Sequence, residues 1–232
     1  MKIVRERIAP ILASLGGLLI MVALIGTFYV VPLAVDTAGG ANFRQKIFYF
    51  HVPVAETSFI SFAVLAIAGA GYLVTRKETW DIVARVAAEV GLLFGIMVMG
   101  TGMIWTRAEW GKWWEWEPRL TTYLILLIFI GGYFLLRSSV EDEQKRARFA
   151  AVFGIIAFLN VPISFFASSS IPRSSVHPPL LIFKGDLPPS FLITFIIGQV
   201  GMLCFASALL IARTQMELAR QDLETVKHAI GG

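Results

Sequence analysis

The sequence predicts an all-α, polytopic membrane protein with six transmembrane helices. Of its 232 residues, 56% are hydrophobic and only 16% are charged, and the mean hydropathy is +0.72. A soluble domain is about 25% charged, so this composition excludes both an ordinary water-soluble fold and a disordered chain. Because one span takes about 20 apolar residues, six spans account for most of the length. We therefore expect residues 1–232 to form a single integral membrane domain.

Six long apolar runs are the expected helices. In chain order they cover residues 11–35, 52–74, 82–104, 120–136, 149–168 and 190–212. The first run is uncharged and too long for the core of a signal peptide, so it is expected to be a retained span. The second carries one carboxylate, Glu56, which is expected either to tune a pocket or to bond to Asn160 or Gln199. The third carries Arg85 and Glu89, whose spacing of four favours a structural ion pair on one helix face. The last three runs are uncharged.

Basic residues predict the orientation of these helices. If the N-terminus is cytoplasmic, twelve of the 20 Lys and Arg residues fall on the cytoplasmic side, seven fall on the other, and Arg85 lies within a helix. An excess of basic residues marks the cytoplasmic side, so both termini are expected there, in the cytoplasmic (inner) membrane. The net charge of +4 then reflects contact with membrane lipid, and nucleic acid is not an expected partner. Three long connections, 36–46, 105–119 and 169–189, face outward. The tail 216–230 is expected to form an amphipathic helix that lies on the membrane surface by default or docks a partner.

Two histidines fall on the predicted outer side. Proline is tolerated in a first helical turn, so Pro53 predicts that the second helix starts there with His51 at its cap. A helix N-terminus disfavours positive charge, and the neutral imidazole is the form that binds metals. An interfacial histidine bonded to a loop carbonyl is an equally open reading of His51. His177 lies in a proline-rich loop, which loses less conformational freedom when it is ordered than a glycine-rich one; a solvated loop histidine is the alternative there.

Five of the six tryptophans lie between Trp105 and Trp116. If this stretch is helical, Trp110, Trp113, Trp114 and Glu117 share one face, and a short helix would lie along the interface as a flat apolar shelf. An interfacial aromatic belt is the alternative. A belt, however, predicts tryptophans scattered over several helix ends, so the cluster favours a binding surface.

Haem is the ligand that suits these features together. It has a planar apolar ring, an iron that takes axial histidines, and two carboxylates. A quinone would suit the aromatic shelf without needing two histidines. The chain has one cysteine, Cys204, and no Cys-x-x-Cys-His motif, so it is not expected to attach haem covalently to itself. Basic residues of the outer connections are candidates to pair with the propionates: Arg44, Lys46, Arg107, Lys112, Arg119 and Arg173.

The string Trp-Gly-x-Trp-Trp-x-Trp-Glu-x-Arg-Leu-Thr at residues 110–121 resembles the tryptophan-rich signature of the haem-handling proteins of cytochrome c biogenesis. That family includes CcmC, CcmF and the system II synthetase, and the length and six spans of this chain resemble its CcmC branch. The Phe-His-Val-Pro stretch around His51 resembles the first histidine motif of the family. Glu117 stands where the family usually has Asp. The resemblance implies that His51 and His177 are axial ligands of the haem iron. It also implies that the ring is cradled by Trp110, Trp113, Trp114, Trp116, Glu117 and Arg119.

The resemblance further implies a role. The protein would hold haem b transiently on the outer face of the membrane and deliver it to the haem chaperone CcmE. It would work beside the ABC-type subunits CcmA and CcmB and the small membrane protein CcmD, and it would not itself be an enzyme. Two other readings remain open: a quinol-linked b-type cytochrome subunit, and a structural subunit of a transporter that uses the tryptophans for docking.

Overall fold

The computed structural model describes residues 2–35, 41–170 and 188–231. Its elements, in chain order, are α1 (Lys2–Tyr29), β1 (Ala34–Val35), β2 (Ala41–Asn42), the 3-10 helix η1 (Phe43–Ile47), α2 (Phe48–Thr75), α3 (Glu78–Trp110), α4 (Pro118–Ser139), α5 (Glu143–Ser170) and α6 (Pro189–Gly231). The two short strands pair antiparallel, with Ala34 opposite Asn42. The described part of the chain is thus a helical bundle with one small hairpin at its end.

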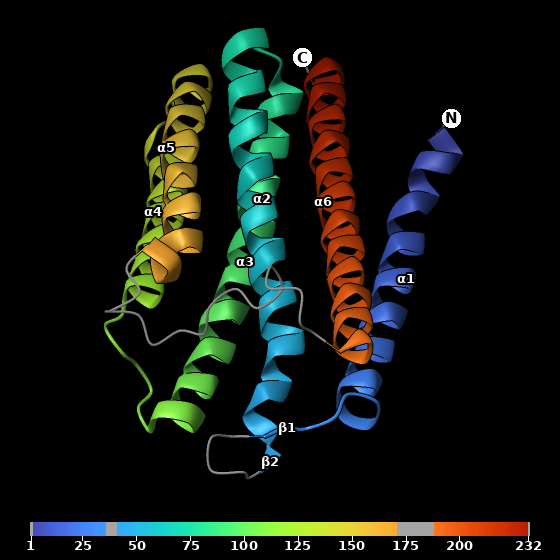
Figure 1. The fold of residues 1–232 in the computed structure, drawn as a ribbon. Coiled ribbons are helices and arrows are strands. Elements are labelled where there is room, and N and C mark those ends of the chain that lie inside the picture. The colour runs from blue at the N-terminus through green and yellow to red at the C-terminus, as the bar shows by residue number, and fades with distance from the viewer. Residues whose placement is uncertain (1, 36–40, 171–187, 232) are drawn as a thin grey trace.

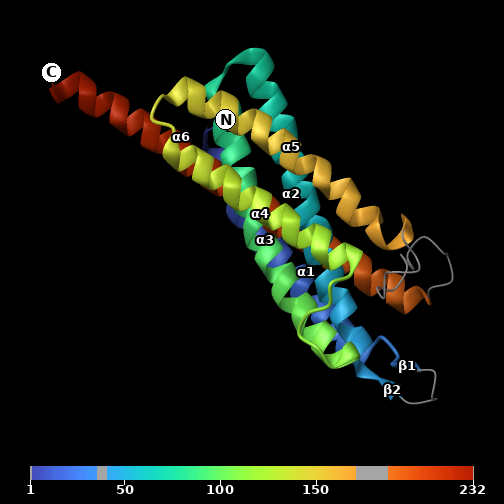
Figure 2. The ribbon, with the colours of Figure 1, turned by 90° about the vertical axis from the view of Figure 1, so that its left-hand side faces the viewer.

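Six helices of the described chain are long and apolar enough to cross a membrane, which confirms the predicted fold class. In Figure 1 they stand side by side, with α1 and α6 on one flank, α2 and α3 in the centre, and α4 and α5 on the other flank. Both chain termini lie at one end of the bundle, and the β1–β2 hairpin lies at the opposite end. Viewed from the side, the last turns of α6 project beyond the other helices (Figure 2).

The helices extend past the apolar runs that predicted them. At about 1.5 Å per residue, the 43 residues of α6 span about 65 Å, twice the roughly 30 Å hydrocarbon core of a membrane. The tail 216–230 is therefore helical, as its spacing predicted, and it continues α6 without a break. Hydropathy reports the part of a helix that prefers lipid, whereas charged residues with good helix propensity prolong the helix into water.

The first helix ends earlier than predicted. The amides of Val30 and Val31 both donate to the Gly26 carbonyl, each at 2.9 Å, and this closes the last turn of α1. Pro32 follows, and it has no N–H with which to continue the helical ladder. The apolar residues up to Val35 therefore leave the helix and lead into β1.

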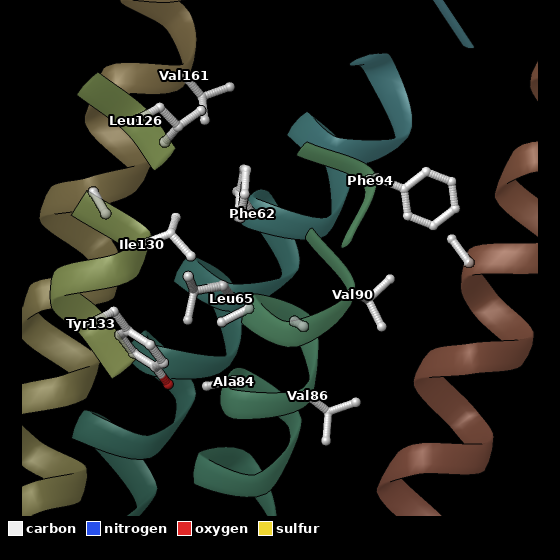
Figure 3. Close-up of a cluster of buried hydrophobic side chains, with 14 of the residues drawn as sticks. Phe62, Leu65, Ala84, Val86, Val90, Phe94, Leu126, Ile130, Tyr133 and Val161 are labelled. Carbon is white, nitrogen blue, oxygen red and sulfur yellow. The ribbon is translucent and has the colours of Figure 1, made fainter. Parts of the chain in front are cut away.

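The core is formed mainly by α2, α3, α4 and α5. Figure 3 shows Phe62 and Leu65 of α2 among side chains of α3 and α4. Phe62, Leu65, Leu126, Ile130 and Tyr133 are all fully buried. This cluster holds together the helices that supply the functional site at one end of the bundle.

Helix α1 packs on α6 through small residues. A methyl group built on Gly16 would lie 2.8 Å from the backbone of Gly201 and Phe205, and one on Gly201 would lie 3.0 Å from the backbone of Ile20. The two backbones are therefore too close to admit a side chain at either glycine. Small residues at such crossings are the usual means by which membrane helices approach each other.

An ion-pair network joins α3 to α6 at the end where the termini lie. Arg85 and Glu89 pair at 3.9 Å, as their spacing predicted. Each also pairs with α6, because Arg85 contacts Glu217 and Glu89 lies 3.0 Å from Arg213. Arg213 pairs in turn with Glu217. Two basic and two acidic groups thus neutralise each other, which supports the structural role expected of Arg85 and Glu89.

Candidate functional site

A cavity of about 320 Å³ opens toward the hairpin end of the bundle. Its walls come from η1, α2, α3, the start of α4 and the late turns of α5, together with Trp114 between α3 and α4 and Phe191 of α6. Most of the lining is apolar or aromatic, including Phe48, Phe59, Met99, Met103 and Phe165. Cofactor sites are typically apolar cavities of about 300–1,000 Å³ with a few placed polar groups.

His51 lies in this cavity, but it is not at a helix cap. Helix α2 begins at Phe48, directly after η1, so His51 is its fourth residue and Pro53 its sixth. The expected helix start near Pro53 was wrong because η1, capped by the side chain of Asn42, leads straight into α2. The His51 Nδ1 atom lies 2.8 Å from the Thr101 hydroxyl of α3.

The tryptophan-rich segment is not one helix: it is helical only up to Trp110. Helix α3 ends at Trp110, and Gly111 adopts a left-handed φ of 74°, which is the usual way to terminate a helix. Residues 111–117 then run irregularly to α4. The predicted common face of Trp110, Trp113, Trp114 and Glu117 is therefore absent from this structure.

The tryptophans form two edge-to-face pairs. The ring centroids of Trp105 and Trp110 are 4.9 Å apart, and those of Trp114 and Trp116 are 5.5 Å apart. Trp105 and Trp114 line the cavity, whereas Trp113 and Trp116 are 58% and 74% exposed. One member of each pair thus faces the cavity, and the other indoles extend the aromatic surface outside it.

Glu117 and Arg119 have different surroundings. Glu117 is only 2% exposed and caps α4, since its carboxylate accepts from the Leu120 amide at 2.6 Å. It does not line the cavity. Arg119 does line it, and its guanidinium donates to the Phe165 carbonyl of α5 at 2.9 Å. Of these two motif residues, Arg119 is the one placed to meet a ligand.

The other basic candidates in the described chain do not line the cavity, although the partner of Arg44, Glu109, does. Lys46 is buried and donates to the Thr27 carbonyl at 2.6 Å and to that of Val31, at the end of α1. The remaining partners are these: Arg44 with Glu109 at 3.3 Å, Arg107 with the Gly111 carbonyl, and Lys112 with Glu115 at 2.8 Å. Arg119 is therefore the basic side chain of the described residues that lines the cavity.

Two buried polar atoms in the cavity wall have no hydrogen-bond partner among the described residues. They are the indole Nε1 of Trp114 and the hydroxyl of Ser164, which is fully buried on α5. Buried polar groups are normally paired, so these two suggest a ligand that accepts hydrogen bonds. With Arg119 they make three donors in one cavity.

Glu56 also lines the cavity, one to two turns beyond His51 along α2. The two predicted partners bond elsewhere: Asn160 donates to the Thr122 carbonyl at 2.7 Å, and Gln199 lies 3.5 Å from the Thr57 hydroxyl. The alternative expectation, that Glu56 belongs to a pocket, is the one that agrees with the structure.

His177 and Arg173 lie outside the described residues, so the second predicted iron ligand is not placed. Within residues 2–35, 41–170 and 188–231, no cluster of three or more His, Cys, Asp or Glu side chains forms a metal site.

Sequence reasoning missed Trp105, Thr101 and Ser164 as members of this site. Trp105 carried a signal, because it belongs to the tryptophan cluster. Thr101 and Ser164 are hydroxyl residues inside apolar runs, where a side chain commonly bonds to its own helix. Such residues become informative only when the partner helix is known.

Comparison with known proteins gives one consistent result. Residues 1–229 match the family model described as "Heme exporter protein C". The chain is 30% identical over 222 residues to the "Heme exporter protein C" of Bradyrhizobium diazoefficiens, which covers 94% of this chain and 83% of that protein. It is 29% identical to that of Haemophilus influenzae, covering 93% and 87%. A "Putative cytochrome c biosynthesis ccmC-like mitochondrial protein" of Marchantia polymorpha is 31% identical over 76% of this chain and 78% of its own length.

Proposed function

Because this chain belongs to the haem exporter protein C family, we propose that it binds haem b in the cavity at the hairpin end and delivers it to the haem chaperone CcmE. Haem is cargo here, and the chain itself carries out no covalent step. The ABC-type subunits CcmA and CcmB and the small protein CcmD are the proposed membrane partners.

The residues of the cavity suit haem as an occupant. Apolar and aromatic walls match a flat tetrapyrrole, and His51 offers an imidazole of the kind that binds haem iron. The three donors Arg119, Trp114 and Ser164 suit the carboxylates of the propionates, and an Arg–carboxylate pair is a strong, directional contact. The cavity is at the small end of the range for cofactor sites, so the cargo would stay partly uncovered, as transfer to a chaperone requires.

The site is proposed to face the outer, periplasmic side of the cytoplasmic membrane. The termini and the hairpin end lie at opposite ends of the bundle, and the excess of basic residues favours termini on the cytoplasmic side. The cavity, Trp113 and Trp116 would then be open to a chaperone outside the membrane. His177, in the connection between α5 and α6, is proposed as the second axial ligand.

The observation that carries this proposal is His51, in an apolar cavity beside Trp105 and Trp114. Purified protein supplemented with haem should show the Soret band of a histidine-ligated haem, and His51→Ala should change it. His228→Ala is the matched control, since His228 lies on α6 near the terminal end. The proposal fails if wild-type protein takes up no haem, or if the His51→Ala and His177→Ala double variant gives an unchanged spectrum.

A quinol-linked b-type cytochrome is the competing function. It requires pairs of histidines facing each other inside the bundle. In the described chain, His51 lies in the first turn of α2, next to the hairpin, and His228 lies near the C-terminal end of α6. The hairpin and the C-terminus are at opposite ends of the bundle, so these two histidines do not face each other. Reduction of bound haem by a quinol with steady turnover would favour the cytochrome over the delivery protein.

A further inference from the structure

The His51 ring contacts helix α3 at two neighbouring residues. Its Nδ1 atom lies 2.8 Å from Thr101 Oγ1, which is 50 residues away in the chain and on the neighbouring helix. A methyl group built on the next residue, Gly102, would lie 3.3 Å from His51 Cε1. The imidazole therefore packs directly on the α3 backbone at Gly102 while its Nδ1 edge meets Thr101.

The neighbours of Thr101 show which atom accepts the hydrogen bond from its hydroxyl group. Oγ1 lies 2.7 Å from the Met97 carbonyl oxygen and 3.2 Å from that of Val98, both in its own helix. Carbonyl oxygens only accept hydrogen bonds, so the hydroxyl donates to Met97. If it donated to His51 instead, two oxygens bearing lone pairs would face each other at 2.7 Å. Thr101 Oγ1 is therefore the acceptor, and His51 Nδ1–H is the donor.

We infer that Thr101 is the positioning residue of His51: it fixes the Nδ1–H tautomer and the ring orientation, so that Nε2 is the nitrogen presented to iron. This inference rests on the proposed function. In a neutral imidazole one nitrogen donates and the other accepts, and the partner of the first decides which nitrogen can bind a metal. A hydrogen bond behind a ligating histidine also raises its basicity and restricts its rotation.

Thr101 has a chemical role that a packing residue would not have. A valine at this position has nearly the same shape but cannot accept a hydrogen bond, whereas a serine keeps the hydroxyl. Thr106 offers a matched control in the same helix, because its hydroxyl donates to the Gly102 carbonyl at 2.8 Å and Thr106 does not line the cavity. Loss of a back-bonded hydroxyl from α3 can therefore be separated from loss of the His51 contact.

The first test needs no haem. With ¹⁵N-histidine in the purified full-length protein at alkaline pH, ring correlation spectra report which nitrogen of each histidine carries the proton, and the His51 signals are those missing from His51→Gln. We expect Nδ1–H in wild type, Thr101→Ser and Thr106→Val, and a shift toward Nε2–H in Thr101→Val. An Nε2–H tautomer in wild type overturns the inference without any variant being made.

The second test uses haem titration and the iron–histidine stretching band. Loss of an outer hydrogen bond to a ligating histidine typically costs about 10–100-fold in metal affinity, so Thr101→Val should weaken haem binding by about that factor and shift the band. Thr101→Ser and Thr106→Val should stay close to wild type. Unchanged affinity and band in Thr101→Val overturn the positioning role. If His51→Ala itself leaves haem binding unchanged, the proposed function fails, and the tautomer result stands separately.

Discussion

Replacing Ser164 with alanine should stabilise the folded protein and lower its affinity for haem. Its hydroxyl is fully buried in the cavity wall and has no partner among the described residues. An unsatisfied buried polar group costs about 1–3 kcal/mol, so Ser164→Ala should raise the free energy of unfolding by about 1 kcal/mol. For a chain of this size that corresponds to a rise in Tm of about 2–4 °C.

The same substitution should act in the opposite direction on binding. If the Ser164 hydroxyl donates to a haem propionate, the charged hydrogen bond contributes about 1.5–3 kcal/mol, so its loss should weaken haem binding about 10–100-fold. Tm is measured by thermal unfolding in detergent and Kd by absorption titration with haem. Ser61 is the matched control: it is buried on α2, away from the cavity, and its hydroxyl donates to the Thr57 carbonyl at 2.8 Å.

Ser61→Ala should lower Tm slightly, or leave it unchanged, and should not alter haem affinity. The reasoning is refuted if Ser164→Ala lowers Tm as Ser61→Ala does while haem affinity stays at the wild-type value. In that case the cavity hydroxyl would be satisfied in the free protein and would not contact the cargo.

Three other substitutions test how the bundle supports the site. Lys46→Met should lower the free energy of unfolding by about 1–3 kcal/mol because carbonyls at the end of α1 lose a charged donor. The haem spectrum should keep its shape, and a changed spectrum with unchanged stability would place Lys46 at the ligand instead. Gly16→Leu should separate α1 from α6 and lower Tm, whereas Gly17→Leu should not, since a Cβ at Gly17 meets nothing within 4 Å. Equal effects on Tm would refute the close helix crossing. Glu117→Ala should lower the free energy of unfolding by about 0.5–2 kcal/mol, because α4 loses its cap, while Glu117→Asp should retain most of the stability in denaturant titration. A Glu117→Ala variant as stable as wild type would show that the cap contributes nothing.

The number and order of the helices followed from the apolar runs, because transfer into lipid depends mainly on composition. The ends of the helices did not follow from these runs, because hydropathy says little about where helical backbone stops. The stop of α1 did have a local signal in Pro32. The amphipathic spacing of residues 216–230 did predict a helix there, but it gave no sign that this helix joins the last apolar run without a break.

The conformation of the tryptophan segment was predictable from signals other than spacing. Gly111 is the residue type that most often ends a helix, and Glu117-Pro118 combines a capping side chain with proline at the first helical position. These signals predict a break between two helices, as the structure has it. The helical spacing of the tryptophans does not correspond to a helix in the structure. It predicted a face of Trp110, Trp113 and Trp114, whereas Trp105 and Trp114 are the indoles that line the cavity.

The roles of single polar residues depend on contacts between segments far apart in the chain. Lys46 looked like a propionate partner because it is basic and near His51, yet it caps α1, 15–19 residues earlier. The link between His51 and Thr101 spans 50 residues. Sequence distance carries no information on either contact, so these assignments needed the packed helices.

The distance from haem iron to His51 Nε2, in an experimental structure of the haem-loaded protein, tests the central claim most directly. A metal–imidazole nitrogen bond is about 2 Å long. We predict that distance for His51, with the ring plane against Trp114 and a second imidazole nitrogen about 4 Å from His51 Nε2 across the iron. Haem bound elsewhere on the bundle, or in the cavity with its iron beyond bonding distance of His51, would contradict the account.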